Sequence, residues 1–286
     1  MAEMTLAAVV RSAAERLAMA GVPDPLVDAE LLAGHIRGLR RGAVQAAIVR
    51  GDTVGEQEVV AFEALVTRRA AREPLQHLTG VAPFRHLELA VGPGVFVPRP
   101  ETEIVVQFAI DALSNAADPA PIGVDLCTGS GAIAMAMATE VPHSRVFAVE
   151  LSPDAHAWAV RNTADAENLT LVQGDLTDSL RELDGTASVV ISNPPYVPDD
   201  AIPRDPEVRL FDPAMALYGG PDGLDIVRVL STRALALLRP GGLLVIEHGE
   251  LQGEAVRSLL AADGWRVPRT HPDLTHRDRA TTALRP

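Results

Sequence analysis

The sequence predicts an α/β fold, in which a small helical segment precedes a mostly parallel, doubly wound sheet. From Ile122 onward, short apolar segments alternate with helical ones, and this alternation is typical of parallel sheets covered by helices. Residues 5–73 instead carry apolar side chains at a spacing of three and four, as amphipathic helices do. The chain has 286 residues, of which 47% are apolar, so it is long enough to bury a sizeable core.

The helical segment is predicted to contain three helices. The first covers residues 6–21 and ends at Gly21, the second covers residues 25–38 and begins at Pro25, and the third lies within residues 55–73. Glycine after a helix and proline at its first position are typical boundary signals.

A hairpin is predicted next, because residues 84–98 alternate around the turn signal Gly92-Pro93-Gly94. We therefore divide the chain into a helical domain (1–80), a hairpin linker (81–99) and a sheet domain (100–286).

The sheet domain is predicted to begin with a helix from Pro100 to Leu113 and a loop over residues 114–121. The strands expected after it cover residues 122–126, 145–151, 169–175, 188–193, 242–249, 265–270 and 279–286. The helices expected between them cover residues 132–141, 153–168, 223–240 and 251–264.

Composition excludes several classes of protein. No apolar run has membrane-spanning length, and the first residues carry charges at helical spacing instead of a signal peptide's apolar core. We expect a cytoplasmic protein that does not engage a membrane. The single cysteine, Cys127, excludes an internal disulfide and a cysteine cage for zinc, and no metal site is predicted.

The charge is distributed unevenly along the chain. Residues 91–286 hold 15 arginines against 27 Asp and Glu, and so carry nearly all of the net charge of −13. Binding duplex nucleic acid needs several cationic contacts, so no direct nucleic-acid partner is expected. The arginines at positions 68, 69 and 72 are predicted to lie on a solvated helix face.

The first candidate site follows the first strand of the sheet. Residues Cys127, Thr128, Gly129, Ser130 and Gly131 form a glycine-containing turn before a helix. Glycines there let backbone N–H groups and a helix N-terminus approach a ligand. The alternative is a tight strand-to-helix turn that binds nothing.

Two carboxylates end the next two strands. Glu150 follows the second strand, where a carboxylate accepts both hydroxyls of a ribose in dinucleotide folds; alternatively, it only neighbours a helix capped by Ser152. Asp175 ends the third strand. Its carboxylate either accepts a hydrogen bond from the exocyclic amine of a ligand or only stabilises a turn, as Asp commonly does.

The fourth strand ends in Asn193-Pro194-Pro195-Tyr196. The prolines fix φ and withhold two N–H donors, so the Asn193 side-chain oxygen and a backbone carbonyl are two acceptors for one planar NH2 group. Tyr196 is able to stack on the group that carries it. The alternative is a proline-rich turn that closes the strand.

These motifs resemble a known family. DLCTGSG, VELSPDA, QGD and ISNPPY are similar to class I S-adenosyl-L-methionine-dependent methyltransferases that modify amino groups. PLQHLTG (74–80), FVPRPETE (96–103), EVRLFDPAMALYGGPDGLDI (207–226) and LLVIEHGELQGEAV (243–256) closely resemble the release-factor glutamine methyltransferases, the PrmC/HemK family. The resemblance implies a small helical bundle, a linking hairpin and a Rossmann-like seven-stranded methyltransferase domain.

The resemblance also implies how S-adenosyl-L-methionine is bound. Cys127–Gly131 would border its methionine part, Glu150 would bind the ribose diol, and Asp175 and Leu176 would edge the adenine. Phe96 would close over the cofactor, and Asn193 would also contact it. The sequence departs from the family twice, with cysteine at 127 where many members have glycine, and leucine at 176 where some have an aromatic ring.

For the substrate, the resemblance implies the glutamine of the Gly-Gly-Gln motif of class-I peptide chain release factors. Asn193 and the Pro194 carbonyl would bind its amide, with Pro195 and Tyr196 completing the site. Positioning and electrostatics should supply most of the rate. No strong base is required, and a lone histidine such as His248 at a strand end is more often structural.

Three alternatives stay open at this point. A methyltransferase acting on DNA or RNA bases uses a similar Asn-Pro-Pro-Tyr slot to bind a flipped base, although the acidic sheet domain argues against this function. An NAD-dependent dehydrogenase fits Gly129-Ser-Gly131-Ala-Ile-Ala134 with Glu150 but leaves Asn193 and its neighbours unexplained. A non-catalytic binding module would have no reason to place polar groups at four strand ends.

Overall fold

The computed structural model describes residues 4–286. Contacts divide the chain into two compact units. The first contains the residues up to Val81 together with Pro203–Phe211, and the second contains Ala82–Ile202 and Asp212–Pro286. Among the residues described, no helix is both long and apolar enough to span a membrane.

The first unit is built from helices around a small apolar core. The helices are α1 (Leu6–Met19), α2 (Pro25–Arg37), α3 (Arg41–Arg50), α4 (Glu56–Ala70), α5 (Leu75–Thr79) and α9 (Pro206–Phe211), and the short strands are β1 (Met4–Thr5) and β2 (Thr53–Val54). The three predicted helices correspond to α1, α2 and α4. The sequence did not predict α3, where only Val44 and Ala47 are buried, because two buried positions leave little periodic signal.

One prediction about this unit is wrong. Arg69 does not lie on a solvated face, since it is only 4% exposed. Its guanidinium donates to Asp28 Oδ2 at 2.7 Å and to Glu207 Oε1 at 2.8 Å. Arg72 donates to the same Glu207 oxygen at 2.9 Å. Buried arginines are retained where carboxylates pair with them, and that pairing joins α2, α4 and α9.

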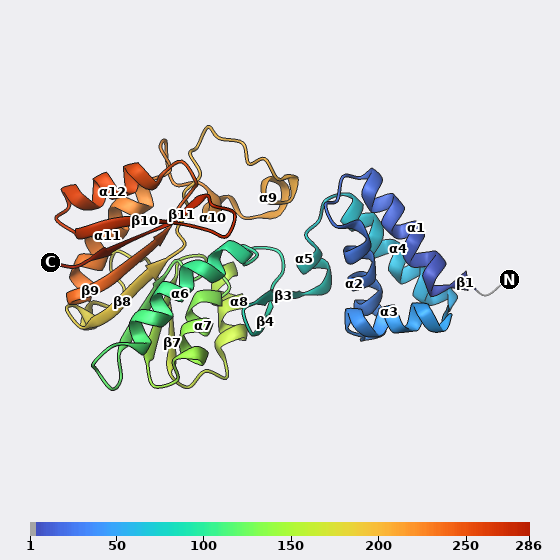
Figure 1. Ribbon diagram of the computed structural model, residues 1–286, viewed down its shortest axis with the longest axis horizontal. Coiled ribbons are helices and arrows are strands. Elements are labelled where there is room, and N and C mark those ends of the chain that lie inside the picture. The colour runs from blue at the N-terminus through green and yellow to red at the C-terminus, as the bar shows by residue number, and fades with distance from the viewer. Residues whose placement is uncertain (1–3) are drawn as a thin grey trace. The chain divides into compact units, whose positions relative to one another are not determined.

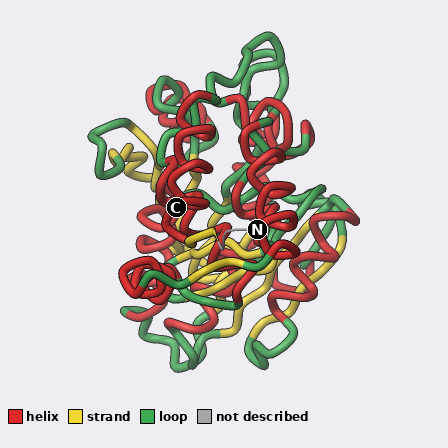
Figure 2. Tube along the Cα trace, turned by 90° about the vertical axis from the view of Figure 1, so that its right-hand side faces the viewer, coloured by secondary structure: helices red, strands yellow, loops and turns green. Residues whose placement is uncertain are grey.

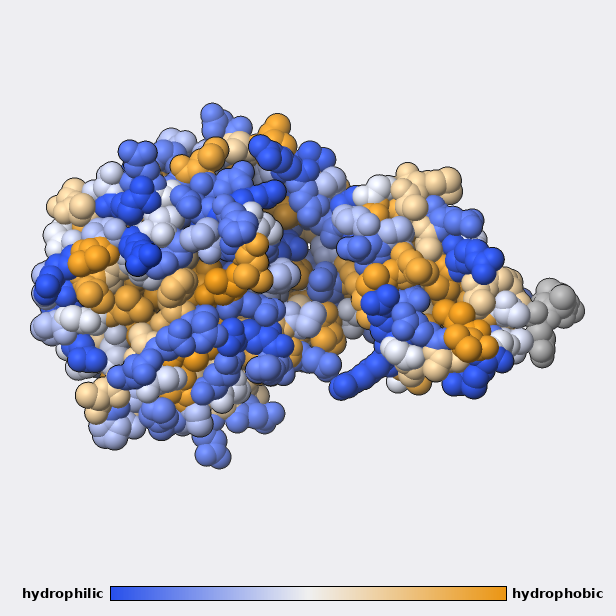
Figure 3. All heavy atoms as spheres, viewed as in Figure 1, coloured by the Kyte–Doolittle hydropathy of each residue, from blue (hydrophilic) through white to orange (hydrophobic). Residues whose placement is uncertain are grey.

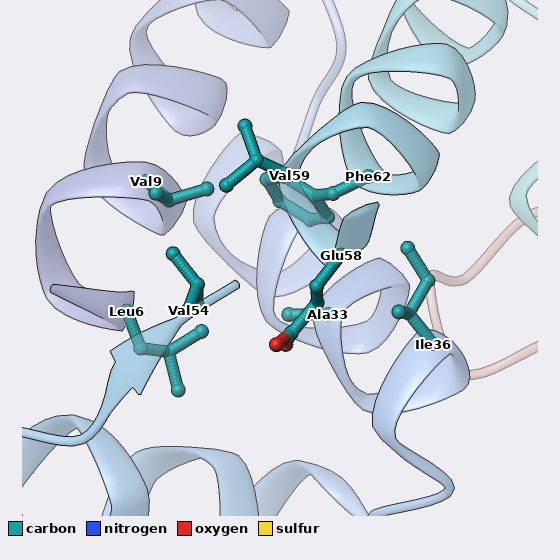
Figure 4. Close-up of a pocket in the computed structure, with 8 residues that line it drawn as sticks. All are labelled: Leu6, Val9, Ala33, Ile36, Val54, Glu58, Val59 and Phe62. Carbon is teal, nitrogen blue, oxygen red and sulfur yellow. The ribbon is translucent and has the colours of Figure 1, made fainter. Parts of the chain in front are cut away.

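A small recess in this unit is lined by side chains from α1, α2, β2 and α4 (Figure 4). The lining residues are Leu6, Val9, Ala33, Ile36, Val54, Glu58, Val59 and Phe62. Its free volume of about 10 Å³ is that of a single water molecule. The recess is therefore too small to hold a cofactor.

The second unit contains a seven-stranded sheet within the described residues, in the order β10-β11-β9-β8-β5-β6-β7. The strands are β5 (Ile122–Leu126), β6 (Arg145–Glu150), β7 (Leu169–Gln173), β8 (Ala187–Ser192), β9 (Leu238–Glu247), β10 (Arg266–Pro272) and β11 (Asp278–Leu284). β11 is antiparallel to both of its neighbours, β9 and β10, while the other pairs are parallel. The strand order reverses beside β5, and ligands bind at such a switch point.

The helices of this unit cover both faces of the sheet (Figures 1 and 2). They are α6 (Pro100–Ser114), α7 (Ala132–Glu140), α8 (Pro153–Thr163), α10 (Ala214–Leu217), α11 (Asp225–Leu237), α12 (Gly253–Ala262) and the 3-10 helix η1 (Arg181–Leu183). Alternate residues of β8 enter opposite cores: Val189 and Ile191 pack with α6 and α7, and Val190 packs with α11 and α12. This alternation is the period of two that a strand buried on both faces requires.

Two predicted boundaries need correction. β9 begins at Leu238, inside a segment predicted as helix, because a helix does not continue through Pro240. The hairpin consists of β3 (Val81–Phe84) and β4 (Leu87–Ala90), so it turns at residues 85–86 and not at Gly92-Pro93-Gly94. Gly92 instead begins a separate turn, in which the Val95 amide donates to the Gly92 carbonyl at 3.4 Å, and a Cβ on Gly92 would lie 2.5 Å from the Trp158 ring.

The surface of each unit is mixed. On the visible face, Figure 3 shows hydrophobic patches interspersed with hydrophilic side chains. Scattered exposed apolar residues are normal for a folded protein. The proposed division at residues 80 and 99 stays a prediction.

Candidate active site

The glycine-containing turn after β5 folds back over a buried carboxyl group. Asp125 is fully buried, and its Oδ2 accepts hydrogen bonds from the Thr128 hydroxyl and from the Ala134 amide at 3.2 Å. Burial raises the pKa of Asp125 to about 7. The two hydrogen bonds fix the start of α7 against the end of β5, so the turn has a defined shape.

Three residues of this turn have positive φ: Cys127 at 64°, Gly129 at 60° and Gly131 at 86°. A side chain at such φ is strained, which explains physically why glycine suits position 127 in the family that the sequence resembles. At Gly129 an added Cβ would meet nothing within 4 Å, whereas at Gly131 it would lie 3.2 Å from Thr163. The turn is therefore open at Gly129 and closely packed at Gly131. Ser130 is buried, and its carbonyl accepts from Asn162.

Glu150 lies against this turn at the end of β6. Its Oε2 accepts from the Gly129 amide at 2.8 Å and its Oε1 accepts from the Ser152 amide at 2.8 Å. Burial raises the pKa of Glu150, and these backbone donors oppose that rise. Ser152 also caps α8 by accepting from the Ala155 amide. The carboxylate thus joins the glycine turn to the start of α8. The Leu151 amide also bonds to it, so of its roughly four acceptor positions one is left for a further donor.

Asp175 and Leu176 follow β7. Asp175 is exposed, and its Oδ1 accepts from the amide and hydroxyl of Thr177, each at 2.8 Å. These bonds lower the pKa of Asp175 and are ordinary turn chemistry. The Gly174 amide donates to the Glu150 carbonyl at 2.9 Å, so Asp175 leaves the sheet beside Glu150. Leu176 packs on the core formed with α11 and α12.

Asn193 follows β8, which pairs directly with β5. The Ser192 hydroxyl donates to the Leu126 carbonyl, and the Ser192 side chain also forms a hydrogen bond with the Cys127 thiol. Burial raises the pKa of that thiol to about 12, so it stays protonated. These contacts hold Asn193 next to the glycine turn. The sequence predicted both motifs, and the structure brings them together.

The side chain of Asn193 is anchored from the interior. Its Nδ2 donates to the Thr102 hydroxyl of α6 at 3.4 Å, a long hydrogen bond. Of the two prolines that follow, Pro194 is buried and Pro195 is half-buried.

Tyr196 is held at both its backbone and its ring. Its carbonyl accepts from Gln252 Nε2 at 2.9 Å, and its phenol forms a hydrogen bond with Arg279. Burial raises the pKa of the phenol. The hydroxyl is therefore engaged inside the protein, and stacking of the ring on a substrate stays a prediction.

Phe96 lies in a segment that packs on α8. The neighbouring Val95 and Val97 are buried with Ala155, and Trp158 Nε1 donates to the Pro93 carbonyl at 3.2 Å. Phe96 itself is partly exposed. The segment thus lies beside the start of α8, close to the turn that Glu150 joins, while closure over a cofactor stays a prediction.

Sequence reasoning missed two residues beneath Asn193. Glu247 ends β9, is 2% exposed and forms a hydrogen bond with Thr102. A signal for each was present, because Thr102 lies within the stretch FVPRPETE and Glu247 ends another strand of the same sheet. Among residues 4–286, no group of three or more His, Cys, Asp or Glu side chains is arranged to hold a metal ion.

His248 is not available as a base. It is fully buried, its Nδ1 donates to the Gly249 carbonyl at 2.9 Å, and its Nε2 lies 2.8 Å from the Thr281 hydroxyl. Burial lowers its pKa. These contacts agree with the structural role expected from the sequence.

Comparisons with known proteins identify relatives of this chain. The family model described as "PrmC N-terminal domain" matches residues 8–80, and the one described as "Methyltransferase domain" matches residues 124–204. A "Release factor glutamine methyltransferase" from Streptomyces coelicolor is 50% identical over 281 residues, covering 97% of this chain and 97% of that protein. A protein of the same name from Bifidobacterium longum is 45% identical over 293 residues, covering 98% of this chain and 100% of that protein. Among solved structures, a methyltransferase from Pyrococcus furiosus is 17% identical with a TM-score of 0.49, covering 78% of this chain and 96% of that chain.

Proposed function

Because this chain belongs to the release factor glutamine methyltransferase family, we propose that it methylates a glutamine side-chain nitrogen in class-I peptide chain release factors. It is an enzyme whose cofactor is S-adenosyl-L-methionine. The glutamine we propose is that of the Gly-Gly-Gln motif. The enzyme would then act in translation termination, and we assign it to the cytoplasm.

The observation that carries this proposal is the position of Asn193 beside the glycine turn. Ser192 bonds to both Leu126 and Cys127, so a methyl donor held by the turn and an amide held by Asn193 would be neighbours. Proximity of this kind is a main source of rate in transfer reactions.

The residues present fit the cofactor. Glu150 is a buried carboxylate with an acceptor position left for a ribose hydroxyl. The open side of the turn at Gly129 leaves room for the methionine part. Asp175 and Leu176 would edge the adenine, and Phe96 would cover it. When bound, the cofactor would supply a methyl group on a sulfonium, and the residues after β8 would hold the substrate nitrogen beside it.

The chain's own residues would prepare the nitrogen. An amide nitrogen is a weak nucleophile because its lone pair is delocalised into the carbonyl. The Asn193 side-chain oxygen and the Pro194 carbonyl would accept its two hydrogens, draw electron density back to the nitrogen and fix its direction. Pro195 would keep the loop rigid, and the ring of Tyr196 would pack on the amide.

We further propose that the helical domain (1–80) and the linker (81–99) supply part of the contact with the release factor. One glutamine side chain offers little surface for affinity or selectivity. A nucleic-acid base in the same slot is the second candidate, but residues 91–286 carry an excess of 12 negative charges, which opposes binding to a phosphate backbone. Family membership decides against a dehydrogenase and against a non-catalytic module.

The experiment is mass spectrometry of the Gly-Gly-Gln peptide from an unmethylated release factor after incubation with the enzyme and S-adenosyl-L-methionine. We expect one added methyl on the glutamine, and none with Asn193→Ala, which should still bind S-adenosylhomocysteine. Asn115→Ala is the matched control, because Asn115 is exposed at the end of α6 and bonds only to the Asp111 carbonyl. Methylation at the normal rate by Asn193→Ala would refute the role of Asn193 in binding the substrate amide. An unmethylated peptide after incubation with the wild-type enzyme would refute the Gly-Gly-Gln glutamine as the substrate.

A further inference from the structure

Three side chains from separate elements form a chain of hydrogen bonds beneath the proposed substrate slot. Asn193 Nδ2 donates to Thr102 Oγ1, and Thr102 bonds in turn to Glu247. Thr102 is 4% exposed and Glu247 is 2% exposed, so solvent water does not replace the hydrogen bonds between these side chains. Glu247 Oε2 has no hydrogen-bond partner among the residues that the structure describes.

When Glu247 is ionised, the chemistry of these groups fixes the direction of every bond in the chain. An ionised carboxylate only accepts hydrogen bonds, so the Thr102 hydroxyl must donate its single proton to Glu247. The lone pairs of Thr102 then face Asn193, and they require a donor there. The NH2 group of Asn193 must turn inward to Thr102, which leaves its carbonyl oxygen Oδ1 on the outward side.

From this chain we propose that Thr102 and Glu247 are positioning residues that hold the Asn193 amide in the one orientation able to accept an N–H from the substrate. The inference rests on the proposed role of Asn193 in binding the substrate amide. Neither residue touches the substrate. Without them an asparagine amide has two orientations of similar shape, and only one presents an acceptor.

Protonation of Glu247 would reverse the chain. A protonated carboxyl donates to Thr102, Thr102 then donates to the Asn193 oxygen, and the NH2 group turns outward, where it repels a substrate NH2. The charged and titratable groups that face Glu247 are Arg279 from β11, Glu101 from α6 and Tyr196 from the loop after β8. Burial outweighs Arg279 and raises the pKa of Glu247 to about 7, so the productive orientation should gain population as pH rises through this value.

The test compares Thr102→Val with Thr102→Ser in the methylation assay. Valine keeps the shape but removes the acceptor for the Asn193 NH2 group, and an unsatisfied buried donor is disfavoured enough to lower kcat by about tenfold or more. Serine restores the hydroxyl and should recover most of kcat. Affinity for S-adenosylhomocysteine, measured by calorimetry, should be the same in both variants, which separates positioning from loss of fold.

The pH profile is the second readout. Wild-type kcat should rise between pH 6 and 8 with an apparent pKa of about 7, and this rise should disappear in Glu247→Gln, which has no charge to gain. A Thr102→Val enzyme with unchanged kcat, a Thr102→Ser enzyme as impaired as the valine variant, or an unchanged pH profile in Glu247→Gln would overturn the inference. Lack of methylation by the wild-type enzyme would instead refute the proposed function.

Discussion

The buried arginine of the helical unit gives a sharp stability prediction. Arg69 lies on α4 with its side chain 5% exposed, between Asp28 at 10% and Glu207 at 11%. Methionine at position 69 keeps the apolar stem and removes the charge. The substitution leaves Asp28 without the guanidinium that it faces, while Glu207 keeps Arg72 at 2.9 Å.

The magnitude follows from burial. Removing one partner of a buried ion pair typically costs about 3–5 kcal/mol, because the remaining charge is uncompensated. Since Arg72 still pairs with Glu207, we expect the free energy of unfolding of this unit to fall by about 3 kcal/mol, the lower end of that range. The adjacent Arg68 provides the matched control: its side chain is 52% exposed and pairs with Glu73, and Arg68→Met should cost less than about 1 kcal/mol.

Hydrogen exchange measured by mass spectrometry on peptides from α2 and α4 reports on this unit separately from the sheet domain. A loss of about 3 kcal/mol accelerates exchange through unfolding by about 100-fold. If Arg69→Met and Arg68→Met exchanged within a few-fold of each other, the buried network would contribute no more than a surface pair, and the reasoning would be refuted.

Two further predictions concern the carboxylates at the strand ends. Glu150→Ala should weaken binding of S-adenosylhomocysteine by more than about tenfold, since a charged acceptor typically contributes about 1.5–3 kcal/mol, and calorimetry showing an unchanged Kd would contradict the role of Glu150. Burial raises the pKa of Asp125 from 3.8 to about 7, so this carboxyl group holds its proton more tightly in the folded protein than in the unfolded chain. The stability that this difference contributes is complete below pH 3.8 and is lost as pH rises through 7. The free energy of unfolding, measured with urea between pH 4 and 8, should fall with pH less steeply in Asp125→Asn than in the wild type. An equal pH dependence in the two proteins would refute the role of the buried carboxyl group.

The main features of the fold could be predicted from the sequence because its signals are local. The run Val189–Ile191 within the predicted strand 188–193 is apolar on both faces and identifies a buried strand, and polar residues directly after such strands mark the edge where ligands bind. The contact of Glu150 with Gly129 at 2.8 Å agrees with that expectation, since adjacent parallel strands bring their ends together.

The glycines of the predicted hairpin show where local signals fail. A turn does occur at residues 92–95, where the Val95 amide donates to the Gly92 carbonyl at 3.4 Å, but it does not join the two strands of the hairpin. Its glycines also leave space that Trp158 and Asp154 of α8 fill, and the sequence gives no means of distinguishing such a turn from the turn of a hairpin. Thr102 and Glu247 each carried a local signal, but they were missed because the hydrogen-bond chain that joins these distant segments has no periodic signature.

The hydrogen-bond donors around the substrate slot, which Asn193 to Tyr196 form after β8, bear on what this slot binds. The prolines have no N–H, the Ser192 hydroxyl donates to Leu126, and the Asn193 NH2 group donates to Thr102. The Tyr196 phenol oxygen accepts from Arg279, because a guanidinium only donates. The Asn193 side-chain oxygen and the Pro194 carbonyl are the acceptors that we propose face the substrate amide. Acceptors in this position favour an uncharged NH2 group over a carboxylate, whose oxygens would face their lone pairs. If Asn193 binds the substrate amide as we propose, selection of glutamine over glutamate would then need no positive charge.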